Sequence, residues 1–361
     1  MSKEDLKPKQ QYNIKSIEER WTKGKSYGKM KMLLGPLMMD GNLSMIFGRF
    51  GVGKSALAFQ IAFAVAKGER LFGMLPNECG PKRVLYFDGE LEDNQIYDRL
   101  RKDGKFPKNI DFIFEDLEFS PDPKDKIDTI LDMVEKEVRT KKYQFIIIDN
   151  LHTLGERLEE STSARMIMKQ LKKIKRLGVS VLVIAHGIKG PEYGPLESNR
   201  MQGSEVIRVY LDTLIGIGKS QRISDDSMKY LINLKNRDNP EDYNQNRVIS
   251  TELTKDENIG LIHEFVDICP ETDHYQDAQI MPSWKEAVKV YWEQNHEKMS
   301  ANSMSDFCIK TLKVSKGNTT IKAYMKELKE EVVSQSETLG ELTDRPVELN
   351  GKFHVIGGEN E

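Results

Sequence analysis

The run GRFGVGKS, residues 48–55, has the residue types and the spacing that bind a polyphosphate. Its glycines allow a tight backbone turn with N–H groups pointing inward, and a helix beginning at Lys54 would add the positive end of its dipole. The Lys54 ammonium neutralises β- and γ-phosphate charge in such a loop, and the Ser55 hydroxyl is a ligand for Mg²⁺. We therefore predict ATP and Mg²⁺ as ligands, with the nucleotide held by Gly48, Arg49, Phe50, Gly51, Val52, Gly53, Lys54, Ser55 and Ala56.

A second apolar run, FIIID at residues 145–149, ends in Asp149. In a chain that has a phosphate loop, this carboxylate is placed to hold Mg²⁺ together with Ser55. Without such a loop it would be an ordinary acid at a strand end. The next residue is Asn150, where many nucleotide hydrolases carry a second acid that polarises water. If the chain hydrolyses nucleotide, that acid has to come from elsewhere.

A third apolar run, RVLYFDGEL at residues 83–91, offers two acids. Either Asp88 or Glu90 could orient or deprotonate the attacking water. The family resemblance given below favours Glu90 over Asp88 for this role. Both acids would also suit the N-terminus of a helix over 91–103, because negative charge is favourable there.

Strand-like apolar runs alternate with helical patterns and would position these side chains. The predicted strands cover 43–48, 83–88, 111–114, 145–149, 179–186, 213–218 and 229–235, followed by a hairpin-like pair at 247–252 and 259–265. The predicted helices cover 54–67, 91–103, 124–139 and 161–176. This alternation, with early strands that are apolar on both faces, indicates βαβ units and an α/β fold with a mainly parallel sheet.

The composition suits a soluble globular protein with more than one domain. Of its 361 residues 38% are hydrophobic and 31% charged, and the formal net charge is −3. That charge argues mildly against tight non-specific DNA binding by a monomer, but it does not exclude a ring with a basic lumen. We expect a cytoplasmic protein with no membrane partner, because the sequence shows neither a signal peptide nor an apolar stretch of the roughly 20 residues that span a bilayer.

The pattern divides the chain into an N-terminal polar arm (1–32), a nucleotide-binding core (33–266), a linker (267–282), a helical domain (283–333) and a tail (334–361). In the helical domain, KVSKGNT separates two helical patterns in the manner of a helix-turn-helix, and six Lys stand against two acids between residues 306 and 329. A DNA-binding domain and a small helical docking or oligomerisation domain both fit this segment.

Together these residues resemble a RecA-like P-loop ATPase, and within that group the RepA-like plasmid replicative helicases, with looser similarity to the DnaB and KaiC groups. The resemblance covers residues 33–266 and rests on GRFGVGKS, YFDGEL, FIIIDNL, VLVIAHGIKG, MQGSEVIRVYLDTLIGI and LINLKNRDN. It implies that the catalytic acid lies on the strand after the phosphate-loop helix, where Glu90 stands. It also implies a homo-oligomer, expected as a hexamer, that acts on single-stranded DNA as a helicase in replication of a plasmid or mobile element.

The resemblance assigns roles to further residues. His186 ends the run VLVIAH, where the family keeps a polar residue that senses the γ-phosphate, although a satisfied buried histidine is the alternative. The loop 187–203 resembles one that lines the channel of such rings, with Lys189 and Arg200 as candidate DNA contacts. Each of these cations would also suit a mobile, solvated loop. Gln202 replaces the family's arginine and puts a cationic role there in doubt.

Lys235 and Arg237, in LKNRDN, match a Lys-x-Arg pair that reaches the neighbouring subunit's nucleotide in the family. A guanidinium there stabilises transition-state charge on the γ-phosphate. In a monomer the same pair would be surface cations at a strand end. The predicted catalytic residues are therefore Glu90, Lys54, Arg237, Lys235 and His186, with Ser55 and Asp149 as the metal ligands.

Two other functions compete with a ring helicase. One is a RecA/RadA-type recombination or repair ATPase, which would form filaments and pair strands. The other is a KaiC-like or defence-system ATP switch with a protein partner, which the acidic net charge and Gln202 slightly favour. An inactive nucleotide-binding module is the weakest alternative, because the full set of Lys54, Ser55, Asp149 and Glu90 is present.

Overall fold

The structure, a computed structural model, describes residues 14–89, 93–99, 106–114, 126–154, 158–188, 194–222, 226–256, 259–275, 284–310, 319–330, 347–349 and 352–354. The chain divides into two compact units. One comprises residues 1–219 and 229–272, and the other comprises residues 220–228 and 273–361.

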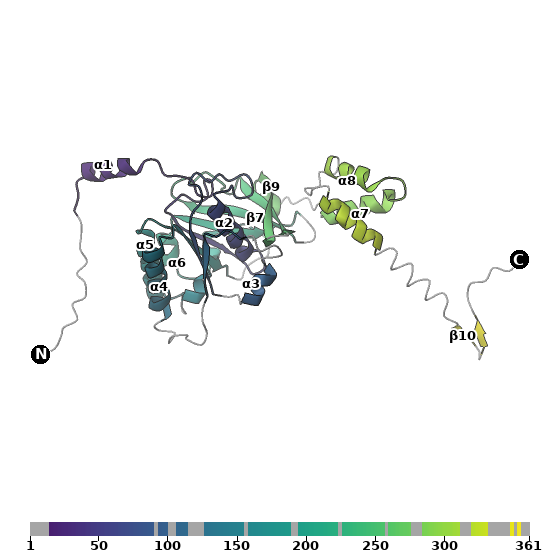
Figure 1. Cartoon of the computed structure of the whole chain (residues 1–361), viewed down its shortest axis with the longest axis horizontal. Coiled ribbons are helices and arrows are strands. Elements are labelled where there is room, and N and C mark those ends of the chain that lie inside the picture. The colour runs from purple at the N-terminus through teal and green to yellow at the C-terminus, as the bar shows by residue number, and fades with distance from the viewer. Residues whose placement is uncertain are drawn as a thin grey trace. The chain divides into compact units, whose positions relative to one another are not determined.

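In the described residues of the larger unit, nine strands form one sheet in the order β3-β2-β4-β5-β1-β6-β7-β8-β9. Figure 1 shows the helices and strands of the chain coloured by residue number. The strands from β3 to β6 in this order are parallel, whereas β7 is antiparallel to β6, and β8 to β9. Their bounds are β1 Leu43–Gly48, β2 Val84–Asp88, β3 Ile110–Phe114, β4 Phe145–Asp149, β5 Ser180–His186, β6 Thr213–Lys219, β7 Met228–Asn236, β8 Val248–Asp256 and β9 Gly260–Cys269. The parallel order brings the C-terminal ends of β1, β2, β4 and β5 to one edge.

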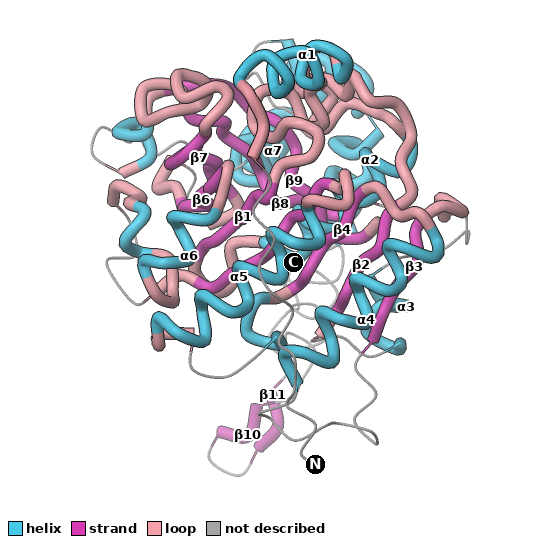
Figure 2. The backbone as a smooth tube through the Cα atoms, turned by 90° about the vertical axis from the view of Figure 1, so that its left-hand side faces the viewer, coloured by secondary structure: helices cyan, strands magenta, loops and turns pink. Residues whose placement is uncertain are grey.

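The central strands are apolar along their whole length because helices cover both faces of the sheet (Figure 2). Side chains alternate between the faces. Ile46 packs with helix α2 (Lys54–Lys67), whereas Met45 and Phe47 pack with helices α4 (Lys126–Lys141) and α5 (Ser161–Lys175) on the other side. Each face therefore has its own buried core, and the strand ends between them are held rigidly.

The helices of the larger unit begin and end where local signals place them. α1 starts at a capping box in which Ser16 Oγ accepts from the Glu19 amide at 3.1 Å and Glu19 Oε2 accepts from the Ser16 amide at 2.9 Å. α2 ends at Gly68, which has φ of +72°. The bounds are α1 Ile17–Tyr27, α2 Lys54–Lys67, α3 Asp93–Arg99, α4 Lys126–Lys141, α5 Ser161–Lys175 and α6 Glu205–Tyr210, with short 3₁₀ turns η2 Leu151–Leu154, η3 Ser198–Arg200 and η4 Glu271–His274.

The smaller unit contains helices α7 Trp284–Asn295 and α8 Ala301–Lys310, and a further helix over 319–330. Their apolar stripes meet in one small core formed by Val288, Trp292, Met304, Cys308, Ile321, Met325 and Leu328. A two-stranded ribbon, β10 Val347–Leu349 and β11 Lys352–His354, follows. The turn predicted between the last two helices, residues 311–318, lies outside the described residues.

The predicted fold class, a RecA-like α/β core with a mainly parallel sheet, is confirmed. Strand 145–149 and helix 54–67 have the predicted bounds. The final hairpin is longer than predicted, because antiparallel pairing between β8 and β9 extends through polar residues such as Lys255 and Asp256, which carry no apolar strand signal. At the other end of the hairpin, pairing of Cys269 with Val248 carries β9 beyond the boundary that the sequence pattern placed at 266.

Candidate nucleotide-binding site

The phosphate loop connects the end of β1 to the start of α2. Gly51 and Gly53 have φ of +78° and +82°, in the left-handed region that favours glycine. A Cβ on Gly53 would also lie 2.6 Å from Leu253 Cδ2 and 2.7 Å from His263 Nε2. Only glycine therefore fits at position 53, both for its backbone angle and for the close approach of the β8–β9 hairpin.

A cavity of about 270 Å³ opens beside this loop. Its polar wall contains Lys54, Ser55, Asp149, Asn150 and His186, and its apolar wall contains Phe50, Ala56, Phe59, Ile259 and Leu261. Such a cavity fits an amphipathic ligand with a charged phosphate end and an apolar base. Ser55 and Asp149 both line this cavity, and the oxygen ligands that their side chains offer suit Mg²⁺.

Lys54 is buried, with 7% of its surface exposed, and donates to the backbone carbonyl of Arg49 at 2.9 Å. Its ammonium is thus held inside the loop, near where phosphate oxygens would lie. We expect Lys54→Ala to weaken MgATP binding about 10- to 100-fold, because one charge-assisted hydrogen bond contributes roughly 1.5–3 kcal/mol. Isothermal titration with MgATP measures this. Lys67→Ala, an exposed lysine at the far end of α2, is the control, and equal affinities in both variants would contradict the assignment.

The carboxylate of Asp149 is held by Tyr86, a residue that was not predicted from the sequence. Tyr86 Oη donates to Asp149 Oδ2 at 2.8 Å, and the Tyr86 ring packs against the rings of Phe59 and Phe112, with centroid distances of 4.8 and 5.2 Å. Phe59 belongs to α2, so this stack links the phosphate-loop helix to the acid. The signal was present in YFD, because alternation along β2 places Tyr86 on the same face as Asp88.

Asn150 stands where many nucleotide hydrolases carry a second acid, and its side chain forms two hydrogen bonds. Its Oδ1 accepts from the His152 amide at 2.9 Å, which leaves Nδ2 to donate to His186 Nε2 at 3.1 Å. An ionised aspartate at this position would lose that donor. His186 and Asp149 are therefore joined through Asn150, and the predicted sensor residue does line the cavity.

Glu90 and Lys189 lie outside the described residues. Gly89, directly before Glu90, donates its amide to the Asp149 carbonyl at 2.9 Å. A Cβ on Gly89 would lie 2.2 Å from Thr153 Cγ2, so glycine is needed where β2 passes Asp149. The chain thus leaves β2 beside the predicted metal ligand.

The loop 187–203 is tied back to the core at both ends. Gly187 forms an antiparallel bridge with Met201, and the Gln202 amide donates to the His186 carbonyl at 2.9 Å. Arg200 lines a small cavity next to the phosphate loop together with Arg49. The described ends of this loop are thus anchored beside the nucleotide site, and DNA binding by Lys189 and Arg200 stays a prediction.

Lys235 and Arg237 lie at the opposite edge of the sheet from the phosphate loop. Lys235 pairs with Leu214 near the start of β6, and the Arg237 amide donates to the Asp212 carbonyl at 3.1 Å. The Asp212 amide in turn donates to Leu43, at the first residue of β1. The phosphate loop begins five residues further on, roughly 17 Å along the strand, so neither cation reaches the nucleotide of its own chain.

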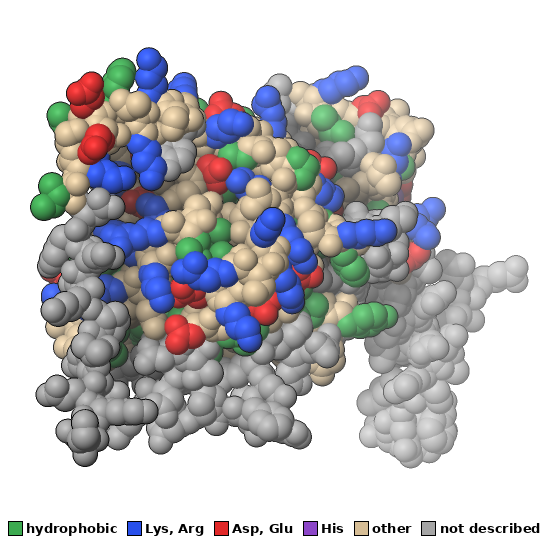
Figure 3. All heavy atoms as spheres, turned by 60° about the vertical axis from the view of Figure 1, so that its left-hand side comes forward, with side chains coloured by type: hydrophobic (Ala, Val, Ile, Leu, Met, Phe, Trp, Pro, Cys, Tyr) green, Lys and Arg blue, Asp and Glu red, His purple; other side chains and the backbone are tan. Residues whose placement is uncertain are grey.

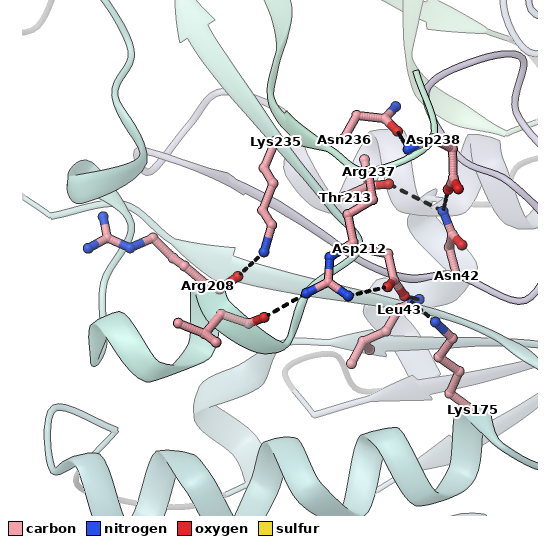
Figure 4. A network of polar contacts seen from close by, with 11 residues as sticks. Asn42, Leu43, Lys175, Arg208, Asp212, Thr213, Lys235, Asn236, Arg237 and Asp238 are labelled. Atoms are coloured by element: carbon pink, nitrogen blue, oxygen red, sulfur yellow. Dashed lines mark hydrogen bonds and ion pairs between the residues drawn. The ribbon is translucent and has the colours of Figure 1, made fainter. Parts of the chain in front are cut away.

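Both cations are held by the end of α6 and by Asp212 (Figure 4). Lys235 Nζ donates to the Arg208 carbonyl at 2.6 Å, and Arg237 donates to the Val209 carbonyl at 3.0 Å and to Asp212 Oδ1 at 3.3 Å. Burial, followed by the charge of Arg237, lowers the pKa of Lys235. Cations at a helix C-terminus are favourable, so these contacts also stabilise α6.

The face of the sheet covered by α4 and α5 carries many cations (Figure 3). Three of them are paired, since Glu135 contacts Arg139 and Lys173 and Glu137 contacts Lys141. These helices pack on the opposite side of the sheet from α2. This basic face is therefore separate from the nucleotide cavity. The exposed cations on α4 and α5 and directly after them are Lys136, Arg139, Lys141, Lys142, Arg165, Lys169, Lys172, Lys173 and Arg176.

His263, which the sequence reading did not single out, is buried between the hairpin and the phosphate loop. Burial lowers the pKa of His263 from 6.5 to about 4, with the charge of Lys229 adding to the shift and a hydrogen bond to Gly53 opposing it. As the pH falls, His263 is protonated in the unfolded chain before it is protonated in the folded chain. The contribution of neutral His263 to the free energy of unfolding is therefore complete above about pH 6.5 and is lost as the pH falls toward about 4.

We expect this loss to reach about 3 kcal/mol of unfolding free energy in the wild type. Urea unfolding of the wild type and of His263→Gln between about pH 7 and about pH 4.5 measures it, since glutamine does not titrate in this range. The gap between the two curves should change by about 2.5 kcal/mol over this range, because the full loss requires a pH below the folded pKa of about 4. Parallel curves would contradict the prediction.

The chain is similar to known proteins over part of its length. A family model described as an AAA domain matches residues 8–192. Two curated proteins named DNA repair protein RadA are similar. The one from Campylobacter jejuni is 30% identical over 173 residues, which is 46% of this chain and 33% of that protein. The one from Aquifex aeolicus is 30% identical over 151 residues, which is 42% of this chain and 28% of that protein. These matches span about a third of the length of the relatives.

Among solved structures, a KaiC-like protein from Pyrococcus horikoshii OT3 aligns over 65% of this chain and 99% of its own, with 13% identity and a TM-score of 0.44. In the described part of the chain, every helix is too short or too polar to cross a bilayer.

Proposed function

We propose that this chain, which belongs to the AAA domain family, is a RecA-like ATPase whose hydrolysis of ATP drives movement on single-stranded DNA. The observation that carries the proposal is the cavity in which Lys54, Ser55 and Asp149 converge, taken together with a cation pair that lies too far away to serve the same nucleotide. A RepA-like, hexameric, cytoplasmic helicase that replicates a plasmid or mobile element is the specific form we propose.

The chain's own residues divide the work of hydrolysis. The phosphate-loop amides and Lys54 hold the β- and γ-phosphates, while Ser55 and Asp149 are the residues that would hold Mg²⁺. When bound, Mg²⁺ neutralises charge that develops on the phosphate oxygens. We assign to Glu90 the orientation and deprotonation of the attacking water. Tyr86 fixes one carboxylate oxygen of Asp149, and His186 is positioned through Asn150 to sense the γ-phosphate.

Arg237 and Lys235 complete the site in a neighbouring copy. Because they lie at the opposite sheet edge, each chain would present them to the nucleotide of the next chain in a head-to-tail assembly. A heterologous interface of this kind closes into a ring or continues as a filament. The anchored loop with Arg200, and Lys189 outside the described residues, is where we propose that single-stranded DNA binds.

A DNA repair ATPase is the second candidate, and the similarity to two proteins named DNA repair protein RadA favours it. It shares the same nucleotide chemistry and differs in the DNA substrate and in the assembly. A KaiC-like ATP switch with a protein partner is the remaining alternative.

The test is steady-state ATP hydrolysis with and without single-stranded DNA, together with the mass of the particle in MgATP. We expect several-fold stimulation by DNA in a particle of ring size. Stimulation in a filament would favour the repair ATPase, and hydrolysis that is indifferent to DNA would contradict a DNA motor.

A further inference from the structure

The imidazole of His263 joins the β8–β9 hairpin to the backbone of the phosphate loop. Its Nε2 lies 3.0 Å from the carbonyl oxygen of Gly53, and its Nδ1 lies 2.9 Å from Thr251 Oγ1. A carbonyl oxygen only accepts, so Nε2 carries the proton and donates to Gly53, while Nδ1 accepts from the Thr251 hydroxyl. The side chain is 0% exposed, and the neutral ring satisfies both bonds.

The backbone of His263 is fixed just as firmly. The His263 amide donates to Gln60 Oε1, and Gln60 Nε2 donates to the His263 carbonyl, both at 3.0 Å. Gln60 belongs to α2, the helix that begins directly after Gly53. The ring is therefore held relative to the loop and to the helix that follows it.

Gly53 is a sensitive place for such a contact. Its carbonyl also accepts from the Leu57 amide at 2.9 Å, which is the first hydrogen bond of α2. The bond from His263 thus occupies the remaining lone pair of a carbonyl whose residue immediately precedes Lys54. The same hairpin contributes Ile259 and Leu261 to the apolar wall of the nucleotide cavity.

We propose that His263 is a positioning residue for nucleotide binding. Its hydrogen bond to Gly53 holds the phosphate loop in the conformation that receives the triphosphate, and it transmits occupancy of the loop to the β8–β9 hairpin. This inference rests on the proposed function, because it requires that the cavity binds ATP.

The test compares His263→Asn with His263→Gln. The amide nitrogen of glutamine extends to about the place of Nε2 and keeps a donor to Gly53, whereas asparagine extends only to about the place of Nδ1. We expect His263→Asn to raise the Kd for MgATP and MgADP and the KM for ATP about tenfold, with kcat within about twofold, as for one lost hydrogen bond. His263→Gln should stay within about threefold of the wild type, with all measurements made well below each melting temperature.

Hydrogen exchange gives a second readout that a purely structural role would not move. MgATP should slow amide exchange over residues 260–269 in the wild type and in His263→Gln, but not in His263→Asn. If His263→Asn does not fold, Thr251→Val replaces it, because loss of the hydroxyl removes the group that fixes the ring tautomer. This variant should raise the Kd for MgATP about threefold.

The outcomes separate the two proposals. Wild-type protein that does not bind MgATP overturns the proposed function and this inference together. Wild-type binding that is unchanged in His263→Asn, or in Thr251→Val if that variant is used, overturns this inference alone, even if the melting temperature falls. Equal protection of residues 260–269 in all variants also overturns it.

Discussion

Arg237→Ala should lower kcat for ATP hydrolysis about 10³- to 10⁵-fold while leaving MgATP binding almost unchanged. An arginine that neutralises charge on the γ-phosphate acts mainly in the transition state, which explains the large effect on turnover. Arg83→Ala is the matched control, because Arg83 also pairs with an aspartate, Asp111 at 2.9 Å, but precedes β2, which is three strands away from β1 in the sheet. Equal activity of the two variants would contradict the assignment.

Mixing experiments decide whether Arg237 acts on a neighbouring chain. Arg237→Ala and Lys54→Ala are each expected to be inactive in homogeneous assemblies. In a random equal mixture, about a quarter of the sites combine an intact Lys54 with an intact Arg237 from the next chain, so activity should return. A finger acting within its own chain gives no recovery, and neither does a chain that remains monomeric. The distance of Arg237 from its own phosphate loop leads us to expect recovery.

Glu90→Gln should preserve MgATP binding and lower kcat about 10²- to 10⁴-fold, because an amide cannot take the proton from water. Single-turnover hydrolysis with excess enzyme separates this loss of chemistry from slow product release. ATP should remain bound and intact in this variant. A loss of this size would indicate that Glu90 supplies the acid that other hydrolases carry at the position of Asn150.

Asp88→Asn tests the alternative assignment, because Asp88 is the other acid at the end of β2. Its register partner is Asp149, and it is buried at 3% exposure. Glu69→Gln, an exposed acid just after α2, serves as the neutral control. Normal turnover in Glu90→Gln, with loss in Asp88→Asn, would move the water-activating role to Asp88.

The sequence by itself determined the elements whose signals are local. The phosphate loop, strand 145–149 and helix 54–67 were readable because glycine spacing, apolar runs and helix periodicity involve neighbouring residues. The α/β class followed from the alternation of such segments. These signals do not depend on knowing which distant parts of the chain meet.

Tertiary structure alone decided which side chains support the site. His263 reaches Gly53 across 210 residues of sequence, and Tyr86 reaches Asp149 across 63, through strand order and register that local patterns do not encode. The same is true of Arg237, because β7 runs antiparallel to β6 and so ends at the sheet edge opposite its own phosphate loop. Apolar periodicity reports that a residue is buried but not against what, so the polar partners of the site became visible only in the folded chain.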